Sequence, residues 1–226
     1  MFIGHFAPAL AARAITSEAP KLGTLFIAAQ LVDWAFFILF LGGVEQMRLV
    51  PGITAMNPFD FYDYPITHSL VGTLIFAAAF GLLVAMRMRN SIAATWAAIV
   101  VASHWMLDWI SHRPDLTLAG GEQTFGLGLW NHPLAAIGAE LAIVGLAFWA
   151  YMARTNGPIV PPIVLLGTML VFQAINWFGP EPTDLGAPFI LLALFAFAVL
   201  TAIAFWVGST RWHRNELGLG VASPPI

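Results

Sequence analysis

A series of histidine and aspartate residues in this sequence has types and spacings that are typical of a metal site. His104, Asp108 and His112 follow one another at intervals of four, so on a helix all three share one face. Two ligands on adjacent turns allow one helix to chelate a single ion. Asp33 and His68 belong to other apolar segments and can complete a set of four ligands. The sequence therefore predicts a metal site formed by Asp33, His68, His104 and Asp108.

Further histidines extend this predicted site. His5 lies near the N-terminus and His132 opens a later apolar segment. We expect Asp108 to bridge toward His5, and His112 and His132 to hold a second ion. Imidazole and carboxylate ligands suit zinc without thiolates, and the chain contains no cysteine, so we expect one or two divalent ions, with zinc as the metal. Glu140 lies two helical turns beyond His132 and is expected to form a pair inside the bundle instead.

The elements that must position these residues are strongly apolar. Hydrophobic residues make up 59% of the chain and charged residues 9%, and the mean hydropathy is +0.81. Soluble domains contain roughly 25% charged residues. We therefore predict that residues 1–226 form a single, all-α integral membrane domain. The net charge of −3 and the lack of basic runs give no indication of a nucleic-acid partner.

Six stretches are long enough to cross a bilayer, which requires about 20 apolar helical residues. They cover about residues 24–43, 67–86, 92–112, 133–153, 160–178 and 187–208. Residues 5–16 are too short to cross, and we expect a half-span helix there. The prediction is a polytopic helical bundle with about six transmembrane helices plus this short N-terminal helix. The metal-site portion covers about residues 1–140, and the additional spans cover about residues 160–208.

The basic residues are distributed unevenly between alternate loops. Seven lie on one side, namely Arg13, Lys21, Arg87, Arg89, Arg154, Arg211 and Arg214, and two lie on the other, namely Arg48 and Arg113. The positive-inside rule predicts that the first side, with both basic terminal segments, is cytoplasmic. The helical rise of 1.5 Å per residue places His5, Asp33 and His104 deepest in the membrane. The predicted site is thus a funnel that opens toward the external or periplasmic side.

The order of these residues resembles that of the bacterial and archaeal membrane-bound metal-dependent hydrolase family of YdjM type. The residues that carry the resemblance are Gly4-His5, Asp33, Thr67-His68-Ser69, His104-x-x-x-Asp108, His112 and His132, within about residues 1–140. The order is also similar to that of zinc-dependent phospholipase C, a soluble helical enzyme with several zinc ions. The first resemblance implies a location in a bacterial inner membrane, and both imply metal-dependent hydrolysis.

The resemblance to phospholipase C has implications for each residue. It implies that Asp33, His68, His104 and Asp108 surround one zinc, that Asp108 bridges to a zinc at His5, and that His112 and His132 bind another. Ala136 stands where those enzymes have a glutamate, so we expect one or two ions rather than three. The implied activity is hydrolysis of phosphoesters or phospholipid-like substrates by metal-activated water. Asp33 and Asp108 are the expected catalytic residues, and Arg113 is expected to contact the phosphate of a lipid or other amphipathic substrate.

Other functions would also place histidines and carboxylates within membrane spans. A metal or proton transporter is the main alternative, although the inner halves of the predicted helices offer few polar residues for a pathway. Haem ligation by His68 and His104 is a second alternative, and a polar network with a structural role only is a third. The metal content of the purified protein discriminates among all of these.

Overall fold

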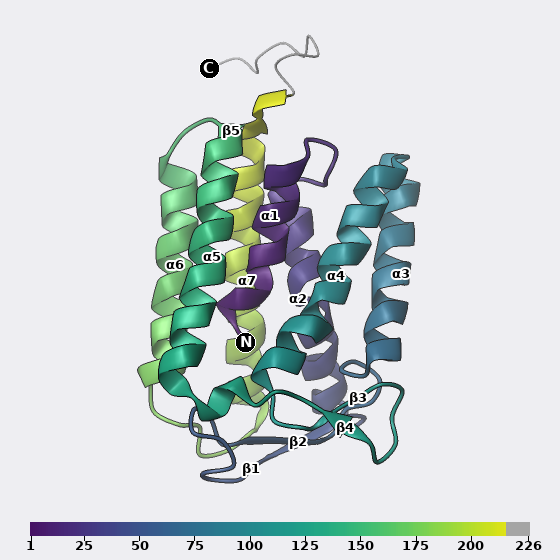
Figure 1. Cartoon of the computed structure of the whole chain (residues 1–226), viewed down its shortest axis with the longest axis vertical. Helices are drawn as coiled ribbons and strands as arrows, with labels where there is room; N and C mark the ends of the chain where they lie inside the picture. Colours follow the sequence, from purple (N-terminus) through teal and green to yellow (C-terminus); the bar gives the residue numbers. More distant parts are fainter. Residues whose placement is uncertain (216–226) are drawn as a thin grey trace.

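The computed structural model describes residues 1–215, and its framework is a bundle of seven helices (Figure 1). The helices are α1 (Ala7–Ile15), α2 (Leu22–Leu41), α3 (Leu70–Met88), α4 (Ser91–Ser111), α5 (Pro133–Arg154), α6 (Val160–Phe178) and α7 (Ala187–Thr210). A 3-10 turn, η1 (Ile3–Phe6), leads into α1, and a second, η2 (Leu129–Asn131), precedes α5. The short N-terminal helix and the six longer helices lie close to the ranges that the sequence predicts.

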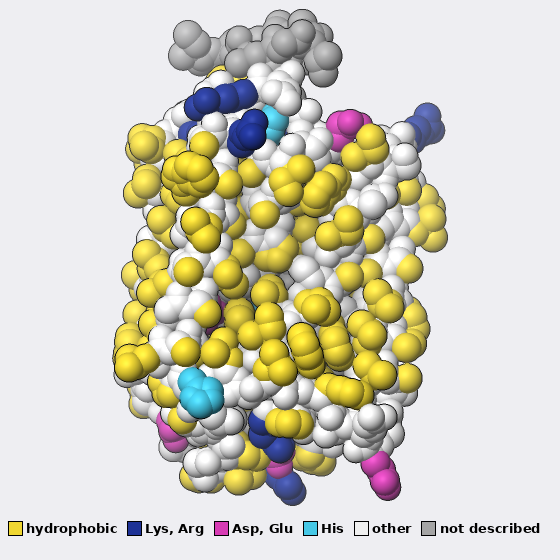
Figure 2. All heavy atoms as spheres, in the orientation of Figure 1, with side chains coloured by type: hydrophobic (Ala, Val, Ile, Leu, Met, Phe, Trp, Pro, Cys, Tyr) yellow, Lys and Arg dark blue, Asp and Glu magenta, His cyan; other side chains and the backbone are white. Residues whose placement is uncertain are grey.

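Within residues 1–215, five helices are long and apolar enough to cross a membrane, namely α2, α3, α5, α6 and α7. Helix α4 has 21 residues but is not among the five, because polar side chains such as His104 and Asp108 lower its mean hydropathy. Figure 2 shows that hydrophobic side chains cover most of the middle of the molecule, whereas charged side chains gather at its two ends. This distribution matches an integral membrane protein.

Two short hairpins and one pairing between distant segments occupy the ends of the bundle, where the sequence predicts no strands. Strand β1 (Gln46–Leu49) pairs with β2 (Phe59–Asp63), and β3 (Leu116–Thr117) pairs with β4 (Thr124–Phe125). These four strands lie together at one end, and β5 (Thr155–Asn156) lies at the other, where it pairs with β6 (Trp212–His213) (Figure 1). The β1–β2 register places Arg48 opposite Asp60.

Helices α3 and α4 form a tight helical hairpin that presents α4 to the rest of the bundle. Arg89 ends α3 in the left-handed conformation (φ 52°), and the side chain of Asn90 accepts hydrogen bonds from the first N–H groups of α4. A side chain at Gly81 would meet the Cβ of Ala98 at 3.1 Å. Small residues therefore allow the two helices to approach closely, as is common between membrane helices.

The N-terminal segment lies inside the bundle rather than along its surface. Ile3, Phe6 and Leu10 are fully buried in the main hydrophobic core. Helix α1 packs against α5 and α2, and η1 also contacts α4 and α6. Because η1 is enclosed in this way, its histidine faces the interior of the protein.

Candidate metal centre

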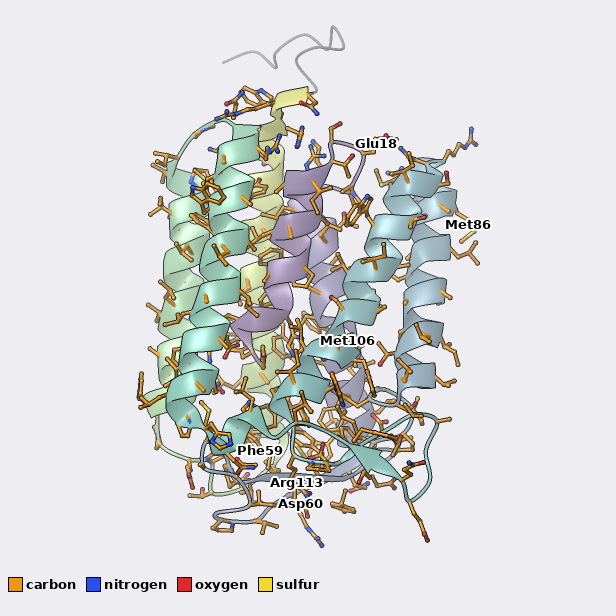
Figure 3. The ribbon with its side chains drawn as sticks, viewed as in Figure 1. Glu18, Phe59, Asp60, Met86, Met106 and Arg113 are labelled. Atoms are coloured by element: carbon orange, nitrogen blue, oxygen red, sulfur yellow. The ribbon has the colours of Figure 1, made fainter. Side chains whose placement is uncertain are left out.

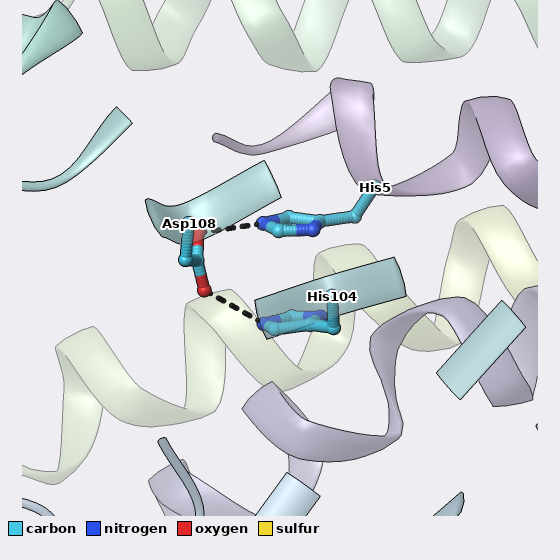
Figure 4. Close-up of side chains that lie close together, drawn as sticks. All are labelled: His5, His104 and Asp108. Carbon is cyan, nitrogen blue, oxygen red and sulfur yellow. Dashed lines mark ion pairs between the residues drawn. The ribbon is translucent and has the colours of Figure 1, made fainter. Parts of the chain in front are cut away.

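The carboxylate of Asp108 is the centre of a buried cluster of histidines. Its Oδ1 atom lies 3.0 Å from Nε2 of His5 and 3.6 Å from Nε2 of His112. Its Oδ2 atom lies 3.1 Å from Nε2 of His104 and 3.7 Å from Nε2 of His68. Figure 4 shows this carboxylate beside the stacked rings of His5 and His104, whose centroids are 3.8 Å apart.

A second carboxylate, that of Asp33 on α2, lies beside the same cluster. Its Oδ1 atom is 3.3 Å from Nε2 of His68 and 3.4 Å from Nε2 of His104. Five separate segments therefore supply the cluster: η1, α2, the turn before α3, helix α4 and the residue that ends α4. The structure brings together six of the seven metal ligands that the sequence suggests.

The protonation of His104 is fixed by its backbone partner. Its Nδ1 atom lies 3.0 Å from the carbonyl oxygen of Ala29. A carbonyl oxygen can only accept a hydrogen bond, so Nδ1 carries the proton. In the neutral ring, Nε2 then carries a lone pair, and this lone pair points at the carboxylates of Asp33 and Asp108.

A carboxylate and a hydroxyl group fix His68 in the same way. Glu45 is fully buried, and its two oxygens accept the backbone N–H groups of Ile66 and Thr67 and the hydroxyl proton of Thr67. The hydroxyl group of Thr67, with its only proton used, must accept at 2.8 Å from Nδ1 of His68. Nε2 of His68 is again the atom that faces the aspartates.

His112 has the third such arrangement. Its Nδ1 atom lies 3.0 Å from Oδ1 of Asp115, which also accepts the hydroxyl proton of Tyr64 at 2.8 Å. Burial and the neighbouring Asp115 carboxylate raise the pKa of Tyr64 well above its ordinary value of 10, so this hydroxyl group keeps its proton and donates it. Nδ1 of His112 is therefore a donor to Asp115, and Nε2 faces Asp108.

These arrangements fit a divalent cation. Neutral imidazoles with protonated Nδ1 atoms would point Nε2 lone pairs at carboxylate oxygens, a contact that is repulsive unless a cation lies between them. Zinc bonds of about 2.0–2.1 Å place neighbouring ligands of a tetrahedron ~3.3 Å apart, and Asp33, His68, His104 and Asp108 show separations of 3.1–3.7 Å. Two groups of three have ligand atoms that all lie within 4.8 Å of one another: His5, His104 and Asp108, and Asp33, His68 and His104. If protons on Nε2 relieved this repulsion in place of a metal ion, the stacked rings of His5 and His104 would both carry a positive charge.

Glu140 and Gln173 hold η1 in place beside the cluster. Oε1 of Glu140 accepts the backbone N–H groups of Phe2 at 2.8 Å and Gly4 at 2.9 Å. Oε1 of Gln173 accepts the N–H group of Ile3 at 3.1 Å, and its Nε2 atom donates to Oε2 of Glu140. The first N–H groups of a helix have no partner within it, so these two side chains satisfy buried donors that water cannot reach. The expectation that Glu140 forms a pair inside the bundle agrees with this arrangement.

Two residues suggested by the sequence lie elsewhere. His132 is exposed at the start of α5, and the structure does not bring it to the cluster. The 3-10 turn η2 comes just before it, and the ring of Trp130, 4.3 Å from that of His112, occupies the position beside the cluster. Arg113 lies at the end of the bundle, where its guanidinium contacts Asp60 and Asp115 (Figure 3).

Sequence reasoning missed the residues that orient the histidines. The sequence patterns gave no role to Glu45, Asp115 or Tyr64. The dipeptide Thr67-His68 and the short spacing between His112 and Asp115 are signals that can indicate such contacts, because metal-binding histidines generally donate their second N–H group to an oxygen.

Comparisons with known protein families, with curated proteins and with solved structures gave no match for this chain. The functional argument therefore depends on the geometry of the cluster.

Proposed function

We propose that this protein is a membrane-embedded, metal-dependent hydrolase of phosphoesters, with zinc as its metal and a lipid or other amphipathic molecule as its substrate. The observation that carries this proposal is the convergence of three imidazole Nε2 atoms, each fixed through Nδ1, on the carboxylates of Asp33 and Asp108. The residue order shared with membrane-bound hydrolases of the YdjM type supports the same function.

The two oxygens of Asp108 favour a centre with two metal positions. Oδ1 faces His5, His112 and the N-terminal amino group of Met1, which lies 3.2 Å away, whereas Oδ2 faces His68 and His104. A carboxylate that presents each oxygen to a different pair of histidines is suited to bridge two ions. Paired ions are a common arrangement in enzymes that cleave phosphoesters.

The residues of the cluster differ in their access to substrate. Zinc can expand from four ligands to five, so a zinc ion held by Asp33, His68, His104 and Asp108 would still supply a water molecule of lowered pKa, near 7, and a Lewis acid for the phosphoryl oxygen. The side chain of Asp33 is 19% exposed and that of Asp108 is 3% exposed. Asp33 is therefore the carboxylate that water and substrate reach, and it orients the attacking water and accepts its proton. Gln30 donates a hydrogen bond of 2.5 Å to Oδ2 of Asp33 and holds this carboxylate in place.

Arg113 is the residue that we propose to contact the substrate phosphate. Arg113 follows His112 and is partly exposed, so it can neutralise negative charge on a substrate phosphate.

The seven basic residues of alternate loops face the cytoplasm of a bacterial cell, and the cluster is nearer the opposite, external end of the bundle. This orientation follows from the positive-inside rule.

Elemental analysis combined with an activity assay tests the proposal. The wild-type protein, purified in detergent, should contain one to two equivalents of zinc and should hydrolyse bis(p-nitrophenyl) phosphate or a short-chain phospholipid. His104→Ala and Asp108→Ala should lose both metal and hydrolysis. Glu122→Ala, which changes an exposed acidic residue, is the matched control and should retain both.

Two outcomes would contradict this function. Full hydrolytic activity in Asp108→Ala would exclude the cluster from catalysis. Metal uptake into proteoliposomes without any phosphoester hydrolysis would assign the cluster to transport instead.

A further inference from the structure

An open pocket of about 470 Å³ lies at the end of the bundle that carries strands β1 to β4. Its walls include Arg48, Asp60, Phe61, Tyr62, Arg113 and Asp115. Figure 3 shows Asp60 and Arg113 together at this end of the molecule. Among residues 1–215, the two arginines of the pocket are also the only lysine or arginine residues in the loops of this end.

A single buried carboxylate organises both arginines. Oδ2 of Asp60 accepts from Nε of Arg48 at 2.7 Å, and Oδ1 accepts from Nη2 of Arg113. The aromatic ring of Tyr62 lies 4.9 Å from the guanidinium carbon of Arg48 and supports it from one side. One carboxylate cannot neutralise two guanidinium groups, so the trio of Arg48, Asp60 and Arg113 keeps a net positive charge.

The arginines also retain unused hydrogen-bond donors. A guanidinium group has five N–H donors. Within residues 1–215, the hydrogen bonds of Arg48 involve Nε alone, and those of Arg113 involve Nη2 alone. The Nε atom of Arg113 is buried and lacks a hydrogen-bond partner, although Oδ2 of Asp115 lies 3.5 Å away. Planar donors of this kind favour the oxygens of phosphate groups.

The pocket and the metal centre share a wall. Asp115 lines the pocket and accepts the hydrogen bond from Nδ1 of His112, whose Nε2 atom lies 3.6 Å from Asp108. The ring of Phe61, another residue of the wall, lies 5.3 Å from that of His112. An anion in the pocket is therefore separated from the cluster by one layer of side chains. Oδ1 of Asp115 is bonded to Tyr64 and His112, whereas its Oδ2 atom lies 3.5 Å from Nε of Arg113.

We propose that this pocket binds a phosphate-type oxyanion between Arg48 and Arg113. The oxyanion can belong to an anionic lipid head group or to free phosphate. This role rests on the proposed function. In it, the pocket holds the polar head group of the substrate at the membrane surface, beside the metal centre. The substrate class is then an anionic phospholipid or a similar amphiphile, and Arg48 acts with Arg113 in recognising it.

Binding of inorganic phosphate to chelator-treated, full-length protein in detergent tests this proposal by isothermal titration calorimetry. Removal of metals prevents phosphate from binding at the cluster itself. The wild-type protein should bind phosphate, and Arg48→Gln should weaken binding at least tenfold. Arg48 has a side chain that is 64% exposed, so its replacement leaves folding intact. Arg87→Gln makes the same charge change at the other end of the bundle and should bind as the wild type does.

A second titration distinguishes the two sources of the oxyanion. The pocket is assigned to a lipid head group if short-chain phosphatidic acid binds more tightly than phosphate and if Arg48→Gln weakens this binding. Equal affinities assign it to free phosphate. The absence of phosphate binding, or equal binding by wild type and Arg48→Gln, would overturn the proposal. Neither result depends on hydrolysis or metal content, so a failure here is distinguishable from a failure of the proposed function.

Discussion

The carboxylate of Glu140 on α5 accepts the backbone N–H group of Gly4 at 2.9 Å, across 136 residues of chain. The same oxygen accepts the N–H group of Phe2, and the other oxygen accepts from Gln173. This carboxylate thus supports the turn from which His5 reaches the histidine and aspartate cluster, although it makes no contact with the histidines of that cluster in the described part of the chain.

Replacement of Glu140 by alanine should therefore destabilise the protein and disturb the centre. It leaves the buried N–H groups of Phe2 and Gly4 without acceptors, and each lost acceptor costs about 1–3 kcal/mol. We expect a clearly lower thermal unfolding temperature and less bound zinc. Glu140→Gln keeps one acceptor oxygen and should have a smaller effect. An alanine variant as stable and as metal-rich as Glu122→Ala would contradict this role.

The hydroxyl group of Thr67 should determine how tightly His68 binds metal. Thr67→Val preserves the shape of the side chain but removes the group that accepts from Nδ1 of His68. Loss of such a contact typically lowers metal affinity about 10–100-fold, and competition with a chromophoric chelator measures this change. Thr67→Ser keeps the hydroxyl group and should bind zinc nearly as the wild type does. Equal affinities for the valine and serine variants would show that Thr67 does not orient the ring.

His112 and His132 offer a direct comparison between a histidine inside the cluster and one outside it. His112→Ala should lose the ion on the Oδ1 side of Asp108 and retain the ion on the Oδ2 side, so the zinc content should fall by about half. His132→Ala should retain the full zinc content, because this side chain is exposed at the start of α5. Elemental analysis of both variants checks the expectation. Loss of metal in His132→Ala would show that His132 is a ligand.

Removal of metal should lower the stability of the folded protein. An ion that binds only the native state stabilises it by RT ln(1 + [L]/Kd), about 2.7 kcal/mol when the free ion is at 100 times Kd. Chelation should therefore lower the unfolding temperature of the wild type, and added zinc should restore it. Asp108→Ala should show no response to either treatment. A wild-type protein that is equally stable with and without chelator would indicate a cluster that holds no ion.

Much of the helical framework was predictable because apolar length alone determines where a membrane helix can form. The four-residue interval between His104 and Asp108 likewise determines that both side chains share a face of α4. Asp33 and His68 were recognisable as costly polar residues within or beside apolar segments. These features are local, so a single sequence contains them.

The remaining features depend on contacts between distant segments. Glu45 and Asp115 belong to the hairpin-bearing loops, whose paths follow no hydrophobic periodicity. The outward position of His132 depends on the turn η2 and on packing of Trp130 against His112. The role of Glu140 depends on the entry of residues 1–6 into the bundle, which apolar composition suggests but cannot place.

The bonds that Ile3 and Gly4 make with Gln173 and Glu140 impose an order on biosynthesis. The ribosome makes residues 3 and 4 long before it makes their partners on α5 and α6. The N-terminal residues therefore lack their final hydrogen bonds until most of the polypeptide has been synthesised. On the proposed function, an ion beside His5 would accordingly bind late, after the later helices have inserted and closed around the N-terminal turn.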